Sequence, residues 1–170
     1  MIEIVRAQYP DPRHAAAVVE LMDRYARDEA GGNQPLSDFA RDNLVSALAA
    51  RPYVFSVLAW EGETPVGLIN AIEGFSTFAC RPLVNLHDVI VVPSHRGRGI
   101  AGWMVAEVEA IARERGACKL TLEVLEGNAS ARALYQRLEF TPYQLDPAMG
   151  HARFLHKWLG LKHEPRGKPP

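Results

Sequence analysis

The chain has 170 residues, 48% of them hydrophobic and 23% charged, which is typical of one globular domain with a sizeable core. It carries 19 lysines and arginines against 20 acidic residues, so its formal net charge is −1. Because a nucleic-acid partner requires a surplus of positive charge to neutralise phosphates, this composition gives no support for a nucleic-acid binder.

The first part of the chain is predicted to form a strand and two helices. Residues 2–6 read as a short strand. A helix is expected from Pro12, with Asp11 as its N-cap, as far as the Gly31-Gly32 pair. A second helix is expected to begin after Ser37, which can cap it. Its inward face is expected to carry Phe39, Leu44, Ala47 and Leu48.

Three strands are expected next. Residues 53–60 are rich in aromatic and β-branched side chains, and after a Glu-Gly-Glu turn residues 66–72 form their hairpin partner. The third strand covers residues 83–92 and stops at a proline. Phe75 and Phe78, between the second and third strands, could line an acceptor cleft or a dimer surface.

The remaining chain is predicted to alternate helices and strands. A strongly amphipathic helix begins at Ile100 and ends near Gly116. Residues 119–125 form a strand, residues 128–138 a short helix capped by an asparagine, and residues 153–158 a last strand.

This order, β-α-α-β-β-β-α-β-α-β, predicts a single α/β domain over residues 1–160 with a mixed, mainly antiparallel sheet. Residues 161–170 are polar and proline-rich, and we expect them to be disordered. Cys80 and Cys118, the only cysteines, stand in no spacing typical of a disulfide framework or metal site. With an acidic N-terminus and no apolar run near the ~20 residues of a membrane helix, we expect a cytoplasmic protein without a membrane segment.

The loop Arg96–Gly102 is the most informative segment. A strand stops at a proline, and a loop rich in glycine and arginine opens directly into a helix. Backbone N–H groups and the helix N-terminus favour an anion there, glycine lets the backbone approach it closely, and arginine adds charge-assisted hydrogen bonds. The pattern predicts a diphosphate site.

Three other interpretations of this loop have to be weighed. A P-loop is excluded because no Gly-Lys-Ser/Thr is present. Gly97–Gly102 does fit the dinucleotide fingerprint GxGxxG, and Glu123 lies at a suitable distance for a ribose contact. However, a hairpin precedes the loop and too little chain follows for a doubly wound parallel sheet. A plain glycine turn between strand and helix is the third alternative.

Two linked motifs resemble those of the GNAT family of N-acetyltransferases. Arg96-x-x-Gly99-x-Ala101 matches the family's Gln/Arg-x-x-Gly-x-Gly/Ala signature, and residues 126–135 are similar to its Asn…Ala…Tyr segment. The resemblance covers about residues 83–140, and the element order extends it over most of the chain. More narrowly, residues 85–91 and the acidic first helix are similar to the diamine/spermidine acetyltransferase branch.

The resemblance implies an acyl-CoA N-acyltransferase fold with acetyl-CoA as co-substrate. The family splits its paired strands beside the strand that ends in Val91, where backbone amides pair with the pantetheine arm and polarise the thioester carbonyl. Asn128 would contact the pantetheine as well as cap its helix. Cofactor contacts are therefore expected at Val89, Ile90, Val91, Arg96, Gly97, Arg98, Gly99, Ile100, Ala101, Gly102 and Asn128.

The resemblance also suggests catalytic residues. Tyr135 is expected to be the general acid, because a phenol of pKa ~10 can protonate a departing thiolate whose thiol has a pKa near ~8.5. The alternative is a core aromatic in a helical apolar stripe. His87 or Asp88, directly or through a water, would accept the amine's proton. No metal is implied.

Two positions depart from the family pattern. Glu139 stands before Phe140 where the family usually has glycine, which puts the turn after this helix in question. His87 stands where the branch commonly has an acid, so the identity of the base stays open.

We expect acetyl transfer to the primary amine of a small molecule, by direct attack in a ternary complex, and a homodimer as in many relatives. An acceptor on a protein or peptide, and a non-catalytic acyl-CoA-binding module, are the alternatives. Acidic residues in the first two helices could attract a cationic amine or form a solvated face. They are Glu20, Asp23, Asp28, Glu29 and Asp38.

Overall fold

A computed structural model describes residues 1–144, 146–157 and 159. The chain separates into two compact units, residues 1–125 and residues 126–170, and each unit is described by itself. None of the helices in the described part of the chain is long and apolar enough to cross a membrane.

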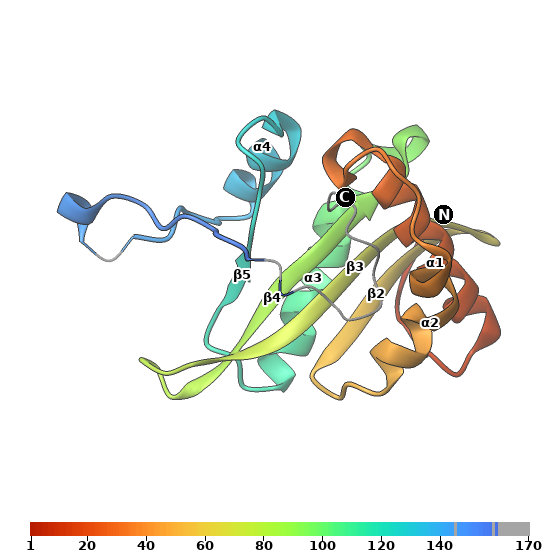
Figure 1. Cartoon of the computed structure of the whole chain (residues 1–170), viewed down its shortest axis with the longest axis horizontal. Helices are drawn as coiled ribbons and strands as arrows, with labels where there is room; N and C mark the ends of the chain where they lie inside the picture. Colours follow the sequence, from red (N-terminus) through yellow and green to blue (C-terminus); the bar gives the residue numbers. More distant parts are fainter. Residues whose placement is uncertain (145, 158, 160–170) are drawn as a thin grey trace. The chain divides into compact units, whose positions relative to one another are not determined.

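A five-stranded sheet forms the centre of the first unit, in the order β1-β2-β3-β4-β5 (Figure 1). Strands β1 to β4 are antiparallel to one another in sequence, and β5 runs parallel to β4. The predicted mixed, mainly antiparallel sheet is thus confirmed. The strands are β1 (Ile2–Arg6), β2 (Val54–Glu61), β3 (Thr64–Ser76), β4 (Arg81–Val91) and β5 (Leu120–Leu122).

Helices cover both faces of this sheet. Helices α1 (Pro12–Arg27) and α2 (Asp38–Ala49) lie on one face, and α3 (Ile100–Glu114) lies on the other (Figure 1). Asn70 of β3 contacts Met22 of α1, whereas a Cβ at Gly67 would meet Met104 of α3 at 2.8 Å. Strand residues an odd number apart point to opposite faces, so β3 has α1 on one side and α3 on the other.

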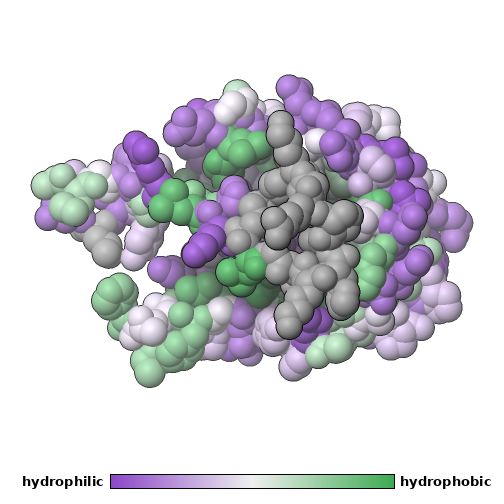
Figure 2. All heavy atoms as spheres, viewed as in Figure 1, coloured by the Kyte–Doolittle hydropathy of each residue, from purple (hydrophilic) through white to green (hydrophobic). Residues whose placement is uncertain are grey.

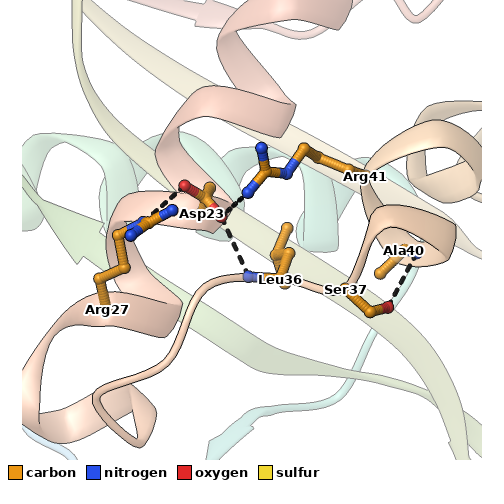
Figure 3. Close-up of polar contacts among 6 residues, drawn as sticks. All are labelled: Asp23, Arg27, Leu36, Ser37, Ala40 and Arg41. Atoms are coloured by element: carbon orange, nitrogen blue, oxygen red, sulfur yellow. Dashed lines mark hydrogen bonds and ion pairs between the residues drawn. The ribbon is translucent and has the colours of Figure 1, made fainter.

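The link between α1 and α2 is fixed by one carboxylate (Figure 3). Asp23 accepts hydrogen bonds from Arg27 Nε at 2.8 Å and from the backbone N–H of Leu36 at 3.0 Å. Arg41 reaches the same carboxylate at 3.1 Å, and Ser37 caps α2 as predicted. The hydrogen bond from Arg27 is the largest influence that lowers the pKa of Asp23.

Two details of these helices differ from the sequence-based expectation. Helix α1 ends at Arg27, and the chain continues as a short 3-10 helix (Glu29–Gly31), because Asp28 takes extended backbone angles and caps that turn. Phe39 is 77% exposed instead of facing inward. At 100° per residue it lies about 140° around the helix from Leu44 and about 180° from Leu48, so the three cannot share a face.

The β3–β4 hairpin extends past the rest of the sheet. β2 pairs with β3 only as far as Ile72, while the β3–β4 ladder continues to Ser76 and Arg81. Phe75 and Phe78 are exposed at this end, and Figure 2 shows hydrophobic residues over the hairpin at the lower left.

In the second unit the described residues contain helix α4 (Ala129–Arg137) and a 3-10 turn (Pro147–Met149). Asn128 caps α4 as predicted, accepting from Ala131 N–H at 3.1 Å. The strand predicted over residues 153–158 is wrong for its described part, since residues 151–157 form no strand. Phe154 and Leu155 are exposed there, so its apolar pattern has no sheet partner to cover it. Residue 158 and the predicted disordered tail, residues 161–170, lie outside the described residues.

Candidate active site

Strands β4 and β5 part after three residues of pairing. Their ladder joins Val84 to Leu120, Asn85 to Thr121 and Leu86 to Leu122, and β5 then ends. β4 continues to Val91. In the described part of the chain, residues 87–91 of β4 therefore have no strand on their β5 side. The expected strand over residues 119–125 is shorter for the same reason: past residue 122 the chain has no partner strand.

A β-bulge in β4 coincides with this separation. On the β3 side Asn70 pairs with Asp88 and Ala71 pairs with Leu86, which leaves His87 as the extra residue. A bulge increases the local twist and re-aims the strand. The backbone of residues 88–91 thus continues as a sheet edge to which an extended ligand can add as a strand.

The same strand runs directly into the glycine loop. After a 3-10 turn (Pro93–His95), Gly97 and Gly99 take left-handed angles of φ 77° and 82°, which strongly favour glycine. The first hydrogen bond of α3 is donated by Trp103 to Gly99 O at 3.1 Å, and no side chain caps the helix.

The N-terminus of α3 is therefore suited to an anion. The N–H groups of Ile100, Ala101 and Gly102 precede the first helical hydrogen bond, and the helix dipole is positive at this end. A Cβ at Gly97 or Gly102 would meet nothing within 4 Å, so the backbone here is open to close approach. These features fit the diphosphate of a CoA thioester.

Both arginines of the loop are held in ion pairs. Arg96 donates through Nε to Val91 O at 3.0 Å and through its terminal nitrogen to Asp28 at 2.6 Å. Arg98 donates to Glu61 at 2.6 Å. The hydrogen bond from Arg96 also lowers the pKa of Asp28. In this geometry the arginines stabilise the conformation of the loop, and the backbone N–H groups are the donors available to an anion.

Glu61, which was expected only as part of a turn, anchors the glycine loop. Its carboxylate accepts from Arg98 and also contacts His95 Nε2 at 2.8 Å. The Arg98 and His95 hydrogen bonds lower its pKa from 4.5 to about 2. The sequence carried no signal for this, because Glu61 is separated from its partners by more than thirty residues.

The two candidate bases are in different surroundings. His87 is exposed and makes none of the side-chain hydrogen bonds found among the described residues. Asp88 is half-buried and accepts from Asn70 Nδ2 at 3.0 Å. Nearby, burial is the main cause that raises the pKa of Tyr25, and the charge of Asp88 raises it further. Asn70 was missed as a site residue, although an asparagine inside the apolar run of residues 66–72 is unusual for a central strand.

Much of the acidic cluster of the first two helices is neutralised by arginines. Glu20 pairs with Arg24 at 2.8 Å, in addition to the pairs already described for Asp23 and Asp28. Three of the five acidic side chains are thus paired with arginines in the structure and are not left free for a cationic amine.

Asn128 and Tyr135 belong to the second unit. Tyr135 is 8% exposed and lies edge-on to Phe140, with ring centroids 5.8 Å apart. The chain after α4 closes with Phe140 N–H bonded to Tyr135 O and Glu139 N–H bonded to Gln136 O. This is the Schellman pattern, and Glu139 occupies its left-handed position with φ 65°. The turn therefore forms without the family's glycine.

The fold does not suit the dinucleotide-binding interpretation of the glycine loop. A doubly wound dinucleotide fold needs a parallel sheet, whereas only the β4–β5 pair is parallel in the described sheet. Among the described residues, no three His, Cys, Asp or Glu side chains are grouped so that they could hold a metal ion.

Known proteins share parts of this sequence. Streptothricin acetyltransferase from Streptomyces lavendulae is 37% identical over 87 residues, which cover 49% of this chain and 46% of that protein. Thialysine N-epsilon-acetyltransferase from Caenorhabditis elegans is 29% identical over 87 residues, covering 51% and 54%. The chain thus spans about half the length of these curated relatives.

Solved structures share the fold. Ribosomal-protein-alanine N-acetyltransferase from Brucella melitensis biovar Abortus 2308 matches with a TM-score of 0.70 and 17% identity over 93% of this chain and 100% of that one. AAC(6')-Iy, solved in complex with the bisubstrate analogue CoA-S-monomethyl-acetylneamine, matches with a TM-score of 0.73 and 18% identity over 93% and 99%. At such identities the likeness shows the fold.

Sequence and fold now agree. The model of the acetyltransferase (GNAT) family matches residues 11–140, which includes β4, the glycine loop and α4. With more than half of the chain matched, this protein belongs to the GNAT acetyltransferase family.

Proposed function

We propose that this chain is an acetyl-CoA-dependent N-acetyltransferase that moves an acetyl group to the primary amine of a small molecule. The observation that carries the proposal is the continuity of β4 with α3. An edge of β4 open over residues 87–91 leads directly into an uncapped helix N-terminus. An extended arm followed by a diphosphate, as in a CoA thioester, has the matching order of groups.

In this proposal the backbone of Val89, Ile90 and Val91 pairs with the pantetheine arm. An N–H from the same strand polarises the thioester carbonyl, which is electrostatic stabilisation of the charge that develops on its oxygen. The N–H groups of residues 97–102 hold the diphosphate, braced by Arg96 and Arg98. Asn128 adds a contact to the pantetheine.

The reaction is a direct transfer in a ternary complex. The amine nitrogen forms a bond to the acetyl carbon, and the bond from that carbon to sulfur breaks. The amine gives up a proton to Asp88 or His87, directly or through a water, and Tyr135 gives a proton to the departing thiolate. Atoms and charges balance without a further reactant.

A small cationic amine is the favoured acceptor, because the relative with 37% identity is named for acetylation of streptothricin and another for acetylation of thialysine. A diamine or polyamine of the branch suggested by residues 85–91 falls in the same class. The fold is also shared with an enzyme named for a ribosomal-protein alanine, so a peptide acceptor is the second candidate. A screen of both classes, read out by free thiol, decides between them.

The organisation of the whole protein is part of the proposal. We infer that residues 1–160 work as one catalytic domain, since the family match runs across both units. A homodimer in the cytoplasm is the expected state, and light scattering of the purified protein tests the dimer.

Calorimetric titration with acetyl-CoA tests the proposed cofactor site through the variant Gly102→Glu. A side chain at this position meets nothing within 4 Å, and an acid in the first turn suits the helix dipole, so the fold is retained. The added charge lies in the turn whose N–H groups would hold the diphosphate, and we expect affinity for acetyl-CoA to fall by about 50-fold or more.

Ala106→Glu is the matched control, because it places the same charge at an exposed position one turn further along α3. It should retain wild-type affinity. Equal binding by wild type and Gly102→Glu, or no binding by the wild type, would contradict the proposed site.

A further inference from the structure

Asn70 is a polar residue buried in the middle of β3, and the proposed reaction gives it no role. It is 3% exposed, and its strand neighbours Ile69 and Ala71 are fully buried apolar residues. An amide in such a position costs free energy unless its hydrogen bonds are made. Asparagine is also depleted in central strands.

A chain of hydrogen bonds across three strands satisfies this amide. Ser56 Oγ of β2 donates to Asn70 Oδ1 at 2.6 Å, and Asn70 Nδ2 donates to Asp88 Oδ2 of β4 at 3.0 Å. Ser56 pairs directly with Asn70 in the β2–β3 ladder, and Asn70 with Asp88 in the β3–β4 ladder. The hydroxyl of Tyr9 lies 2.8 Å from Ser56 Oγ and extends the chain.

The order of donors and acceptors fixes how the amide lies. Because Ser56 donates to the carbonyl oxygen of Asn70, the NH₂ group is turned towards Asp88. Asn70 and Asp88 pair directly on neighbouring strands of the sheet, which holds the distance between their side chains. One oxygen of Asp88 is thereby occupied by Asn70.

The chain of hydrogen bonds ends at Asp88, where β4 becomes an open edge of the sheet. Asp88 is the residue after the bulge, and β5 has already ended at Leu122. His87, the bulge residue itself, is exposed and receives no such support. A group that must meet a substrate proton within hydrogen-bond distance benefits from being held in place.

We propose that Asn70 is a positioning residue, which holds one carboxylate oxygen of Asp88 so that the other accepts the proton of the amine. The inference rests on the proposed acetyl transfer and selects Asp88 over His87 as the base. Asn70 acts only through Asp88 and does not contact the substrate.

The test is a double-mutant cycle on steady-state acetyl transfer, with an amine identified in the screen. Asn70→Leu keeps the size of the side chain and removes its hydrogen bonds. We expect kcat to fall by about 30-fold, within the range that small misplacements of a catalytic group cause, while KM for acetyl-CoA changes less than about twofold. In the Asp88→Ala background, Asn70→Leu should change kcat by less than about twofold.

Asn85→Leu is the matched control. This asparagine also joins neighbouring strands, donating to Thr121 and Glu123, but it lies three residues before Asp88. Its replacement should leave kcat within about twofold of wild type. If circular dichroism shows that Asn70→Leu is unfolded, Ser56→Ala replaces it in the cycle. That variant keeps Asn70 but frees its amide to turn, and we expect a smaller loss of kcat that also disappears in the Asp88→Ala background.

Three results would overturn the inference: full activity of Asp88→Ala, full activity of the Asn70 variant, or an equal loss in both backgrounds. The failure of the proposed function is distinguishable from these. In that case the wild type itself neither binds acetyl-CoA nor acetylates any amine of the screen.

Discussion

Tyr135 and Asp88, which carry the two proton transfers of the proposed reaction, are held in different ways. Asp88 is fixed by hydrogen bonds between strands of the first unit. Tyr135 is buried in the second unit and packs edge-on against Phe140. The aromatic ring of Tyr135 contributes packing, whereas the proposed proton transfer requires its hydroxyl group. Removing the oxygen alone therefore separates the structural role of this residue from its catalytic role.

Tyr135→Phe makes that separation. The ring and its packing remain, and we expect kcat to fall by about 10²–10⁴-fold, which is typical of the loss of a general acid. Affinity for acetyl-CoA, measured by calorimetry, should stay within about twofold. Tyr143→Phe removes a hydroxyl from a half-exposed tyrosine of the same unit and should leave kcat unchanged. An unchanged kcat in Tyr135→Phe would show that Tyr135 is a packing residue only.

On the scale of elements, the loop Pro93 to Gly99 is held from two directions. Arg96 pairs with Asp28 at the end of α1. Arg98 and His95 both contact Glu61 at the end of β2. These contacts connect the proposed diphosphate site to both neighbouring elements. Because the charge of Glu61 is needed for its contacts with Arg98 and His95, we expect their contribution to stability to depend on pH.

Glu61→Gln tests this sensitivity through the melting temperature at different pH values. The native pKa of Glu61 is about 2 against an ordinary 4.5, so its charge stabilises the folded state above about pH 5. That contribution is lost as the pH falls towards 2. We expect wild type to melt above Glu61→Gln at pH 6–7, and the gap to narrow below pH ~4.5 and close near pH ~2.

The neighbouring Glu63 provides the control for this series. Its side chain is 90% exposed and lies 3.2 Å from Arg13, outside the loop. Glu63→Gln should melt with the wild type at every pH. A gap for Glu61→Gln that stays constant down to pH 2 would refute the proposed anchor.

The ends of α3 and α4 use the same turn with different residues. After α3, Gly116 takes the left-handed position with φ 72°, and the N–H groups of residues 116 and 117 bond back to Arg113 and Ala112. After α4, Glu139 takes that position with φ 65°. A residue with a side chain pays about 1–2 kcal/mol to adopt the left-handed region. Glycine avoids this cost but loses more backbone entropy on folding, so replacing such a residue by glycine recovers only part of it.

Glu139→Gly is therefore expected to stabilise the end of α4 by about 0.5–1 kcal/mol. Hydrogen exchange of the α4 amides measures it, and protection should increase by about two- to fivefold. Gly116→Ala, in the equivalent turn of α3, should destabilise the first unit. Unchanged or faster exchange of the α4 amides in Glu139→Gly would show that Glu139 is not strained.

On the scale of the whole molecule, the fold was largely predictable because it follows from local patterns. Alternating apolar residues, the caps Asp11, Ser37 and Asn128, and the turn at Gly62 each specify an element by themselves. The two errors in the predicted strands have a common cause. Residues 153–157 and the end of the strand after Leu122 have strand-like composition, but a strand exists only where a partner supplies hydrogen bonds.

Part of the candidate site was likewise predictable from local sequence patterns. The glycine loop was recognised from sequence because its residue types are required by backbone conformation at consecutive positions. The motif of Asn128 and Tyr135 was likewise contained in one short helix.

What only the tertiary structure decided is which distant groups meet. The early end of β5 leaves the edge of β4 open, Glu61 and Asp28 hold the loop's arginines, and Asn70 holds Asp88. Each of these contacts joins residues far apart in the chain, and the strand register that aligns them depends on the packing of the whole sheet. The sequence by itself thus determined the family, most of the elements and the conformation of the glycine loop, because each of these depends on contiguous residues. The contacts that hold Asp88 and the loop's arginines depend on folding to bring separate elements side by side.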